Sequence, residues 1–151
     1  MWQTHSASAE ETFVLGRVLG ERAFPGTVVI LSGDLGAGKT ALARGVGAGL
    51  AVRSRVQSPS FAVLQAHEGG RLPFWHVDLY RLESASELDS IGLDEALEGQ
   101  GVVVIEWGER FPQALPADRL ELRLEEEGEG RRISVNATGP VHQQLEVLDG
   151  A

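Results

Sequence analysis

One stretch of eight residues places glycines, a lysine and a hydroxyl side chain in the order that binds phosphate groups. It runs from Gly33 to Thr40 as GDLGAGKT and satisfies the pattern G-x-x-x-x-G-K-[ST]. In such a loop the glycines let backbone N–H groups point inward at a phosphate, and the lysine reaches the β- and γ-phosphates. The hydroxyl of Thr40 can ligate magnesium. The stretch therefore predicts a nucleotide site that depends on Lys39.

The lysine content of the chain indicates which nucleotide this site takes. Of the 13 basic residues, Lys39 is the only lysine, and the others are arginines. A planar guanidinium cannot replace a slender ammonium inside a phosphate-binding loop, so this position keeps its lysine where other cationic positions carry arginine. The guanine-binding N/T-K-x-D element of GTPases needs a second lysine, which this chain lacks. We therefore expect ATP rather than GTP.

A second candidate group is an acid at the end of a short apolar run. Residues 102–106 read VVVIE, which is typical of a buried strand that ends in Glu106. Enzymes with this loop hold magnesium with the loop hydroxyl and an acid at the end of a neighbouring strand. We expect Glu106 to hold magnesium, directly or through water. The alternative is an ordinary surface charge at the end of a strand.

The segment 76–81, HVDLYR, alternates, so that His76, Asp78 and Tyr80 are expected on one face of a strand. Aspartate is disfavoured in the middle of a strand, and its neighbours on this face suggest a lined site. Asp78 could order or deprotonate the attacking water or hold a magnesium-bound water. A polar face turned to solvent is the alternative. The candidates for further phosphate contacts are Arg44, Arg53, Arg55 and Arg81, for each of which an ordinary surface position is the alternative.

The patterns around these residues predict an α/β fold. Ser8 and Glu11 form a capping pattern at the start of a helix over 8–23. The apolar run 27–32 predicts a buried strand before the Gly-rich turn, and a helix over 39–51, weakened by three glycines, follows the turn. The remaining expected elements are strands 61–66 and 72–82 as a hairpin, one or two short helices within 83–98, strand 102–106, a hairpin of 119–126 with 131–137, and a helix over 141–148.

Together these elements predict a P-loop NTPase-like sheet with a mainly parallel core, added antiparallel strands and flanking helices. The 151 residues fit a single ATPase domain over 1–151. With no cysteine, the chain has neither disulfides nor a thiolate metal site. No apolar run is long enough to span a membrane, and we expect a soluble, cytoplasmic protein. The net charge of −9 disfavours strong nucleic-acid binding by the chain alone.

The chain resembles the TsaE (YjeE) family of small bacterial P-loop ATPases. The resemblance rests on four segments in order, which are GDLGAGKT at 33–40, SPSF at 58–61, HVDLYR at 76–81 and VVVIEW at 102–107. It implies ATP and Mg²⁺ as cofactors and a role in the threonylcarbamoyl modification of the adenosine beside the tRNA anticodon. It also implies two partners, the transferase TsaD and its paralogue TsaB, and it implies that this protein does not carry out the transfer itself but resets or activates the transferase.

The resemblance also assigns residues. It places magnesium ligands at Thr40 and Glu106, a functional acid at Asp78 and a nucleotide contact at Thr12, and it makes Lys39, Asp78 and Glu106 the catalytic set. A switch-like loop near the γ-phosphate corresponds to 58–61, where Ser60 stands in place of the usual threonine and keeps the hydroxyl. The expected nucleotide contacts are Thr12, Gly33, Leu35, Gly36, Ala37, Gly38, Lys39, Thr40 and Ser60.

Two other functions remain open at this point. A small-molecule kinase shares the loop and the size, but it should carry an acceptor pocket and usually an arginine-rich lid, and no lid segment is evident. A nucleotide-gated binding module with negligible turnover is the second alternative. Hydrolysis by the chain alone should be slow because no arginine finger is identifiable, and such a group accelerates hydrolysis by about 10³ to 10⁵.

Overall fold

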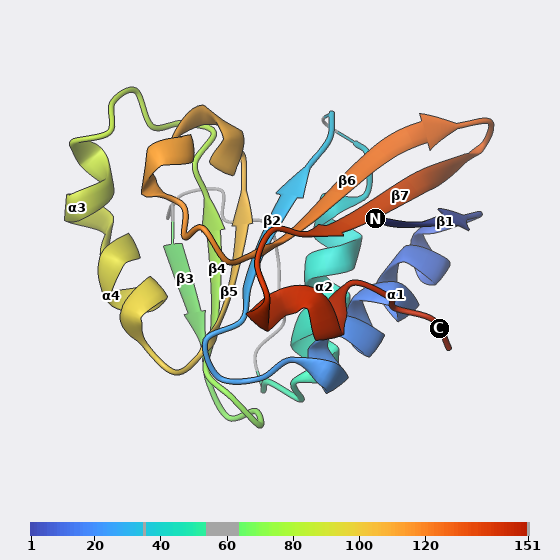
Figure 1. The fold of residues 1–151 in the computed structure, drawn as a ribbon, viewed down its shortest axis with the longest axis horizontal. Coiled ribbons are helices and arrows are strands. Elements are labelled where there is room, and N and C mark those ends of the chain that lie inside the picture. Colours follow the sequence, from blue (N-terminus) through green and yellow to red (C-terminus); the bar gives the residue numbers. More distant parts are fainter. Residues whose placement is uncertain (35, 54–63, 151) are drawn as a thin grey trace.

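The computed structural model of the chain describes residues 1–34, 36–53 and 64–150. Helices and strands alternate along most of this length (Figure 1). The strands are β1 (Trp2–Ser6), β2 (Val28–Ser32), β3 (Leu64–His67), β4 (Phe74–Asp78), β5 (Val102–Glu106), β6 (Leu120–Glu127) and β7 (Gly130–Ala137). The α-helices are α1 (Ala9–Arg22), α2 (Lys39–Gly49), α3 (Glu87–Ile91) and α4 (Leu93–Glu98), and 3-10 turns cover Gly108–Arg110, Pro112–Ala114 and Val141–Leu145.

All seven strands belong to one sheet in the order β1-β7-β6-β2-β5-β4-β3. The four central strands β6, β2, β5 and β4 are parallel to one another, whereas β7, β1 and β3 pair antiparallel with their neighbours. β2 and β5 lie in the middle of the sheet, which explains why both are continuous apolar runs with no polar face. The predicted α/β sheet with a parallel core and added antiparallel strands is confirmed.

Parallel pairing brings the carboxyl ends of three strands to one edge of the sheet. Leu31 near the end of β2 lies opposite Glu106 of β5, and Asp78 at the end of β4 lies opposite Glu106 from the other side. The loop from Gly33 to Gly38 leaves β2 at this same edge and enters α2 at Lys39. The sheet therefore sets the loop and both candidate acids side by side, as open α/β sheets do for their ligands.

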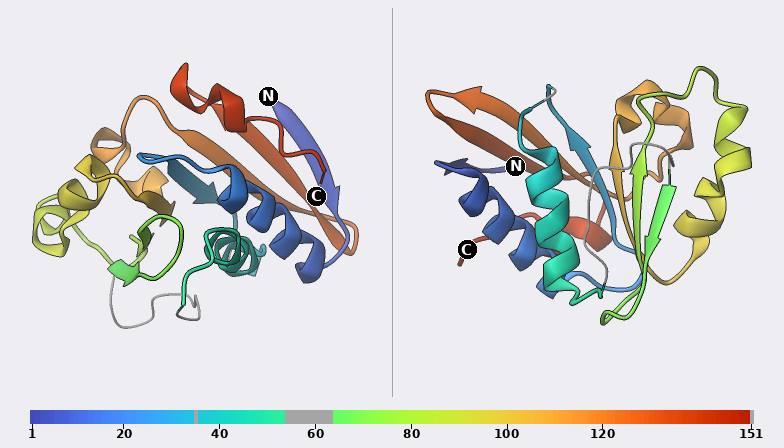
Figure 2. Two further views of the ribbon diagram at one scale, coloured as in Figure 1. Left: turned by 90° about the horizontal axis from the view of Figure 1, so that it is seen from below. Right: turned by 180° about the vertical axis from the view of Figure 1, so that it is seen from behind.

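Helices cover the sheet on both faces (Figures 1 and 2). Two buried apolar clusters follow from this arrangement. One joins α1 and α2 to Val29, Leu31 and Val104, and the other joins α3 and α4 to Val77 and Ile105. Consecutive residues of β2 and β5 thus alternate between the two clusters, so the sheet is anchored on both sides. None of the described helices is both long enough and apolar enough to cross a membrane.

α1 and α2 lie side by side and run in the same direction (Figure 2). They touch backbone to backbone at two pairs of glycines, Gly16 with Gly45 and Gly20 with Gly49. A Cβ atom built at Gly45 would lie 2.9 Å from the Cα of Gly16, and one built at Gly49 would lie 2.9 Å from the Cα of Gly20. The glycines of α2 were expected only to weaken the helix. Gly45 and Gly49 are needed because any side chain at these two positions would push the two helices apart.

Most of the other expected elements are present, with three differences. The strand Trp2–Ser6 was not predicted, because five mixed residues carry little periodic signal and the strand exists through its pairing with β7. The expected helix over 141–148 is a 3-10 turn at Val141–Leu145. The strand expected over 72–82 is shorter and ends at Asp78, whereas its pairing with Leu64–His67 confirms the predicted hairpin.

Candidate nucleotide-binding site

The loop between β2 and α2 uses backbone conformations that suit glycine. Gly33 has φ +143° and Gly38 has φ +102°, and a Cβ at Gly33 would lie 2.5 Å from the carbonyl oxygen of Leu124. Gly38 is the residue before the first turn of α2, so the N–H groups at this helix start are directed toward the loop. Such a helix start attracts anions, and phosphate above all. Of the expected loop contacts, Leu35 lies outside the described residues.

Lys39 is held over this loop. Its side chain is buried, and Nζ donates a hydrogen bond of 2.8 Å to the carbonyl oxygen of Gly33. The ammonium also lies 3.9 Å from the ring centroid of Trp107, within range of a cation–π interaction. The single lysine of the chain is therefore folded back across the loop, where a bound phosphate would meet it.

A pocket of about 250 Å³ brings the predicted groups together. Thr40, Asp78 and Glu106 line it together with Lys39, although they come from α2, β4 and β5. Gly36, Gly38 and Trp107 complete the lining. Three sequence segments that lie far apart thus converge on one small pocket, and that pocket opens at the carboxyl edge of the sheet.

Asp78 lies in a partly buried position whose electrostatics favour its protonated form. Desolvation is the largest cause and raises the pKa of Asp78, and the negative charge of Glu106 raises it further. The backbone N–H of Tyr80, which donates to Oδ1 at 2.9 Å, opposes this rise, as do His76 and Lys39. A carboxyl group with a raised pKa is suited to accept a proton, which agrees with the role expected for Asp78.

The expected polar face of β4 is only partly as predicted. His76 is fully buried, and its Nε2 lies 2.6 Å from Oε2 of Glu106, so this face is not turned to solvent. Tyr80 lies beyond the end of the strand, is 49% exposed, and packs against Trp107 at 4.9 Å between ring centroids. The alternative of a solvated polar face is wrong at His76 because that side chain faces the buried carboxylate instead of water.

Glu106 is also buried, which excludes the interpretation of an ordinary surface charge. Thr40 and Glu106 offer a hydroxyl and a carboxylate oxygen at one pocket, and oxygen ligands of this kind suit Mg²⁺. No group of three or more His, Cys, Asp or Glu residues that could hold a metal exists among the described residues. This donor set fits an ion that takes one or two protein oxygens and completes its shell with water and phosphate.

Three residues make contacts at or near the site that local sequence patterns do not predict. Arg131 of β7 donates from Nε to the carbonyl oxygen of Ala37 at 3.1 Å and from Nη2 to that of Gly36 at 3.0 Å. Trp107 covers Lys39 with a backbone φ of +63°, which is unusual for a bulky residue. Arg110 donates to the carbonyl oxygens of Leu79 and Tyr80, directly after Asp78. No local motif marks contacts that depend on pairing between distant strands.

The arginines expected as phosphate contacts are placed differently from one another. Arg53 follows α2, and its side chain lies against Gly69 in the β3–β4 turn, at the opposite end of α2 from the loop. Arg81 is exposed, Arg44 lies within α2, and Arg55 is outside the described residues. Ser60 and the whole segment 58–61 also fall outside them.

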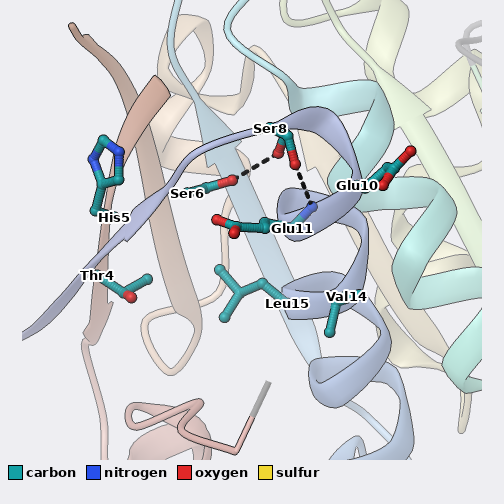
Figure 3. A pocket seen from close by; sticks show the side chains of 8 residues that line it. All are labelled: Thr4, His5, Ser6, Ser8, Glu10, Glu11, Val14 and Leu15. Atoms are coloured by element: carbon teal, nitrogen blue, oxygen red, sulfur yellow. Dashed lines mark hydrogen bonds between the residues drawn. The ribbon is translucent and has the colours of Figure 1, made fainter. Parts of the chain in front are cut away.

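Thr12 is buried in the first turns of α1. Its hydroxyl lies 2.7 Å from that of Ser6, and its methyl group would be 3.7 Å from a Cβ at Gly38. A larger depression of about 540 Å³ lies nearby between β1 and α1 (Figure 3). There the hydroxyl of Ser6 donates to the Ser8 carbonyl, and the Ser8 hydroxyl accepts from the N–H of Glu11. These polar groups cap the helix, while Thr12 stays a predicted nucleotide contact.

Comparisons with known proteins agree with this architecture. The model of the family described as "Threonylcarbamoyl adenosine biosynthesis protein TsaE" matches residues 6–133. The tRNA threonylcarbamoyladenosine biosynthesis protein TsaE of Bacillus subtilis is 38% identical over 95% of this chain and 89% of its own length. The protein of the same name from Streptomyces coelicolor is 46% identical over 74% of this chain and 76% of its own length.

A solved structure shows the same fold. The crystal structure of Bacillus subtilis YdiB matches this chain with a TM-score of 0.84 and 33% sequence identity, and the match covers 95% of this chain and 90% of that one. The shared fold, the matching family model and the identity to relatives over most of their length agree. This chain belongs to the TsaE family.

Proposed function

We propose that the chain is an ATP-binding, slowly hydrolysing P-loop protein that acts in the biosynthesis of threonylcarbamoyladenosine in tRNA. The observation that carries this proposal is the pocket in which Lys39, Thr40, Asp78 and Glu106 converge beside the Gly-rich loop. Membership of the TsaE family, whose name refers to this pathway, supports the biological role. The single lysine in the chain supports ATP over GTP.

The residues of the pocket have different roles in binding phosphate, holding the metal and orienting water. The N–H groups of the loop and of the first turn of α2 bind phosphate oxygens, and Lys39 neutralises charge on the β- and γ-phosphates. Thr40 and Glu106 would hold Mg²⁺, which when bound neutralises charge that develops on the phosphates. Asp78 orients the attacking water and accepts its proton, since desolvation raises the pKa of this carboxyl group. Trp107 shields the lysine from solvent on one side.

We propose further that the chain works with a TsaD-like transferase and its TsaB-like paralogue. No residue in the described pocket is an arginine, so the pocket lacks the group that accelerates phosphoryl transfer about 10³ to 10⁵-fold in related enzymes. Slow hydrolysis by the isolated chain and stimulation by partners follow from this composition. The net charge of −9 is in keeping with leaving tRNA binding to the partners.

Phosphate release with and without the two partner proteins tests the proposal. Partner-stimulated hydrolysis is the expected result, whereas transfer of phosphate to a small acceptor would point to a kinase, and tight binding with no turnover would point to a nucleotide-gated module. Filter binding of tRNA to the isolated chain at physiological salt is expected to be weak. Sub-micromolar affinity would contradict the proposed division of labour.

Two matched substitutions test the site itself. Lys39→Arg keeps the charge but replaces a slender ammonium by a planar fork, and we expect it to abolish ATP turnover. Arg132→Lys, a charge-conserving change at a side chain 46% exposed, serves as the control and should leave turnover unchanged. Normal turnover by the Lys39→Arg protein would refute the assignment of the loop.

A further inference from the structure

A buried hydrogen-bonding contact joins a histidine to the candidate metal ligand. Nε2 of His76 lies 2.6 Å from Oε2 of Glu106, and the two side chains are 0% and 4% exposed. The two residues lie on adjacent parallel strands, where Asp78, two positions after His76, pairs directly with Glu106. His76 therefore reaches Glu106 diagonally across the same face of the sheet.

The geometry fits a hydrogen bond that His76 donates from Nε2. An ionised carboxylate only accepts hydrogen bonds, so the tautomer with its proton on Nε2 matches this contact. Nδ1, on the other side of the ring, is buried with no hydrogen-bond partner in the described part of the chain. The ring stacks on Phe74 with an interplanar angle of 9° and 6.2 Å between centroids. The packing of the ring thus holds Nε2 of His76 in place to donate to Oε2 of Glu106.

This arrangement orients Glu106 within the pocket. Because the bond engages Oε2, the carboxylate cannot rotate freely about its last torsion, and Oε1 takes no part in this bond. Glu106 lines the pocket, so a fixed carboxylate presents its oxygens there in one orientation. Residues that hydrogen-bond to a metal ligand commonly set the metal affinity of a site, and their loss costs about 10 to 100-fold in affinity or activity. A histidine that only satisfied a buried acid would contribute to folding and leave metal binding unchanged.

We propose that His76 is a positioning residue that orients the Glu106 carboxylate for binding the divalent cation beside the nucleotide phosphates. This inference rests on the proposed function, since it concerns the metal of the same site. It assigns no proton transfer to His76. His76 contributes one hydrogen bond that fixes the orientation of the Glu106 carboxylate. The expected consequence is a higher affinity for the divalent cation, which a metal titration measures separately from hydrolysis.

Three substitutions separate positioning from simple burial. His76→Gln keeps an N–H donor near the position of Nε2, His76→Asn places its amide near the position of Nδ1 and is too short, and His76→Leu removes the donor. Binding of Mn²⁺ to each protein with saturating ADP is measured by electron paramagnetic resonance, and ADP affinity in EDTA is measured alongside. Thermal unfolding reports on folding, and the Mg²⁺ midpoint of ATP hydrolysis is a further readout.

The expected result is a graded loss of metal affinity at constant nucleotide affinity. His76→Leu and His76→Asn should weaken Mn²⁺ binding about 10 to 100-fold, and His76→Gln should stay within about threefold of the parent. ADP affinity in EDTA should be the same in all proteins. Unchanged Mn²⁺ affinity in a folded His76→Leu or His76→Asn protein would overturn the proposal, and so would a His76→Gln protein as weak as these two.

A measurement on the unsubstituted chain covers the case in which these variants do not fold. In protein carrying ¹⁵N-labelled histidine, the ring nitrogens of His76 should show a proton on Nε2 and none on Nδ1. Their resonances should shift when Mg²⁺ is added to the ADP complex but not when ADP is added in EDTA. Absence of a metal-dependent shift would overturn the inference. If the parent protein bound neither Mn²⁺ nor ADP, the proposed function itself would fail, which is a distinguishable outcome.

Discussion

The glycine contact between α1 and α2 predicts that one added methyl group at Gly45 destabilises the protein. Helix propensity alone predicts the opposite, because alanine is better than glycine by about 1 kcal/mol inside a helix. The sign of the change therefore distinguishes the packing argument from the propensity argument. The change is Gly45→Ala, which adds a Cβ on the face of α2 that touches α1.

The geometry sets the size of the effect. The new Cβ would lie 2.8 Å from the backbone N of Arg17 and 2.9 Å from the Cα of Gly16, and closest of all to the carbonyl oxygen of Phe13. These are backbone atoms with no rotamer to change, so the helices must separate. Overpacking of this kind costs about 1–3 kcal/mol. Because the clash is with backbone atoms, we take the upper part of this range, about 2–3 kcal/mol, and subtract the propensity gain of about 1 kcal/mol. The expected net loss is about 1–2 kcal/mol, or about 2–8 °C in melting temperature.

Thermal and denaturant unfolding of Gly45→Ala measure this loss. Gly99→Ala is the matched control, since its Cβ would lie 3.4 Å from the nearest atom, in ordinary contact, and its backbone φ is −79°. The control should change stability by less than about 0.5 kcal/mol. Because α2 begins at Lys39, Gly45→Ala should also weaken ATP binding. A Gly45→Ala protein more stable than its parent would refute the packing argument.

Three further predictions concern the loop and two acids. Arg131→Leu removes two hydrogen bonds to loop carbonyls and should weaken ATP binding about tenfold in titrations with a fluorescent analogue, whereas Arg132→Leu should not. Asp78→Asn should slow hydrolysis and raise the melting temperature at neutral pH. Burial raises the pKa of Asp78, so its charged form destabilises the folded protein once the pH exceeds the pKa that the group has in the unfolded chain. The gain in melting temperature should vanish near pH 3, where the group is protonated in both states. Desolvation raises the pKa of Asp118, but the hydrogen bonds that Val141 and His142 donate to it outweigh this effect and leave the pKa lowered. The stability that the charged carboxylate contributes is therefore present above its unfolded pKa of about 4, and it is lost as the pH falls through the pKa of the folded state. Asp118→Asn should therefore flatten the acid side of the curve of unfolding free energy against pH.

The parts of the site that the sequence predicts are those encoded by local patterns. Lys39 is marked by its loop, and Glu106 is marked by the buried run that it ends. Because parallel strands end at one edge, the prediction that these groups meet needs only the strand assignments. The structure brings Lys39, Thr40, Asp78 and Glu106 to one pocket as expected.

The parts that the sequence does not predict depend on contacts between distant segments. Arg131 acts on Gly36 and Ala37 only because β7 lies two strands from β2, which no local pattern encodes. His76 looked equally compatible with a solvated face, because alternation is the same whether a face meets water or a buried acid. The glycines of α2 lower helix propensity, and their use in packing becomes visible only when α1 is placed against them.

The position of Trp107 has an optical consequence. Its indole ring lies 3.9 Å from the only ammonium side chain of the protein and packs against Tyr80, whereas the other two tryptophans, Trp2 and Trp75, do not line this pocket. A phosphate that draws Lys39 away from the ring changes the electric field on the indole, and with it the emission of this one residue. With Trp2 and Trp75 replaced by phenylalanine, the intrinsic fluorescence of the unlabelled protein should report directly on phosphate binding at the loop.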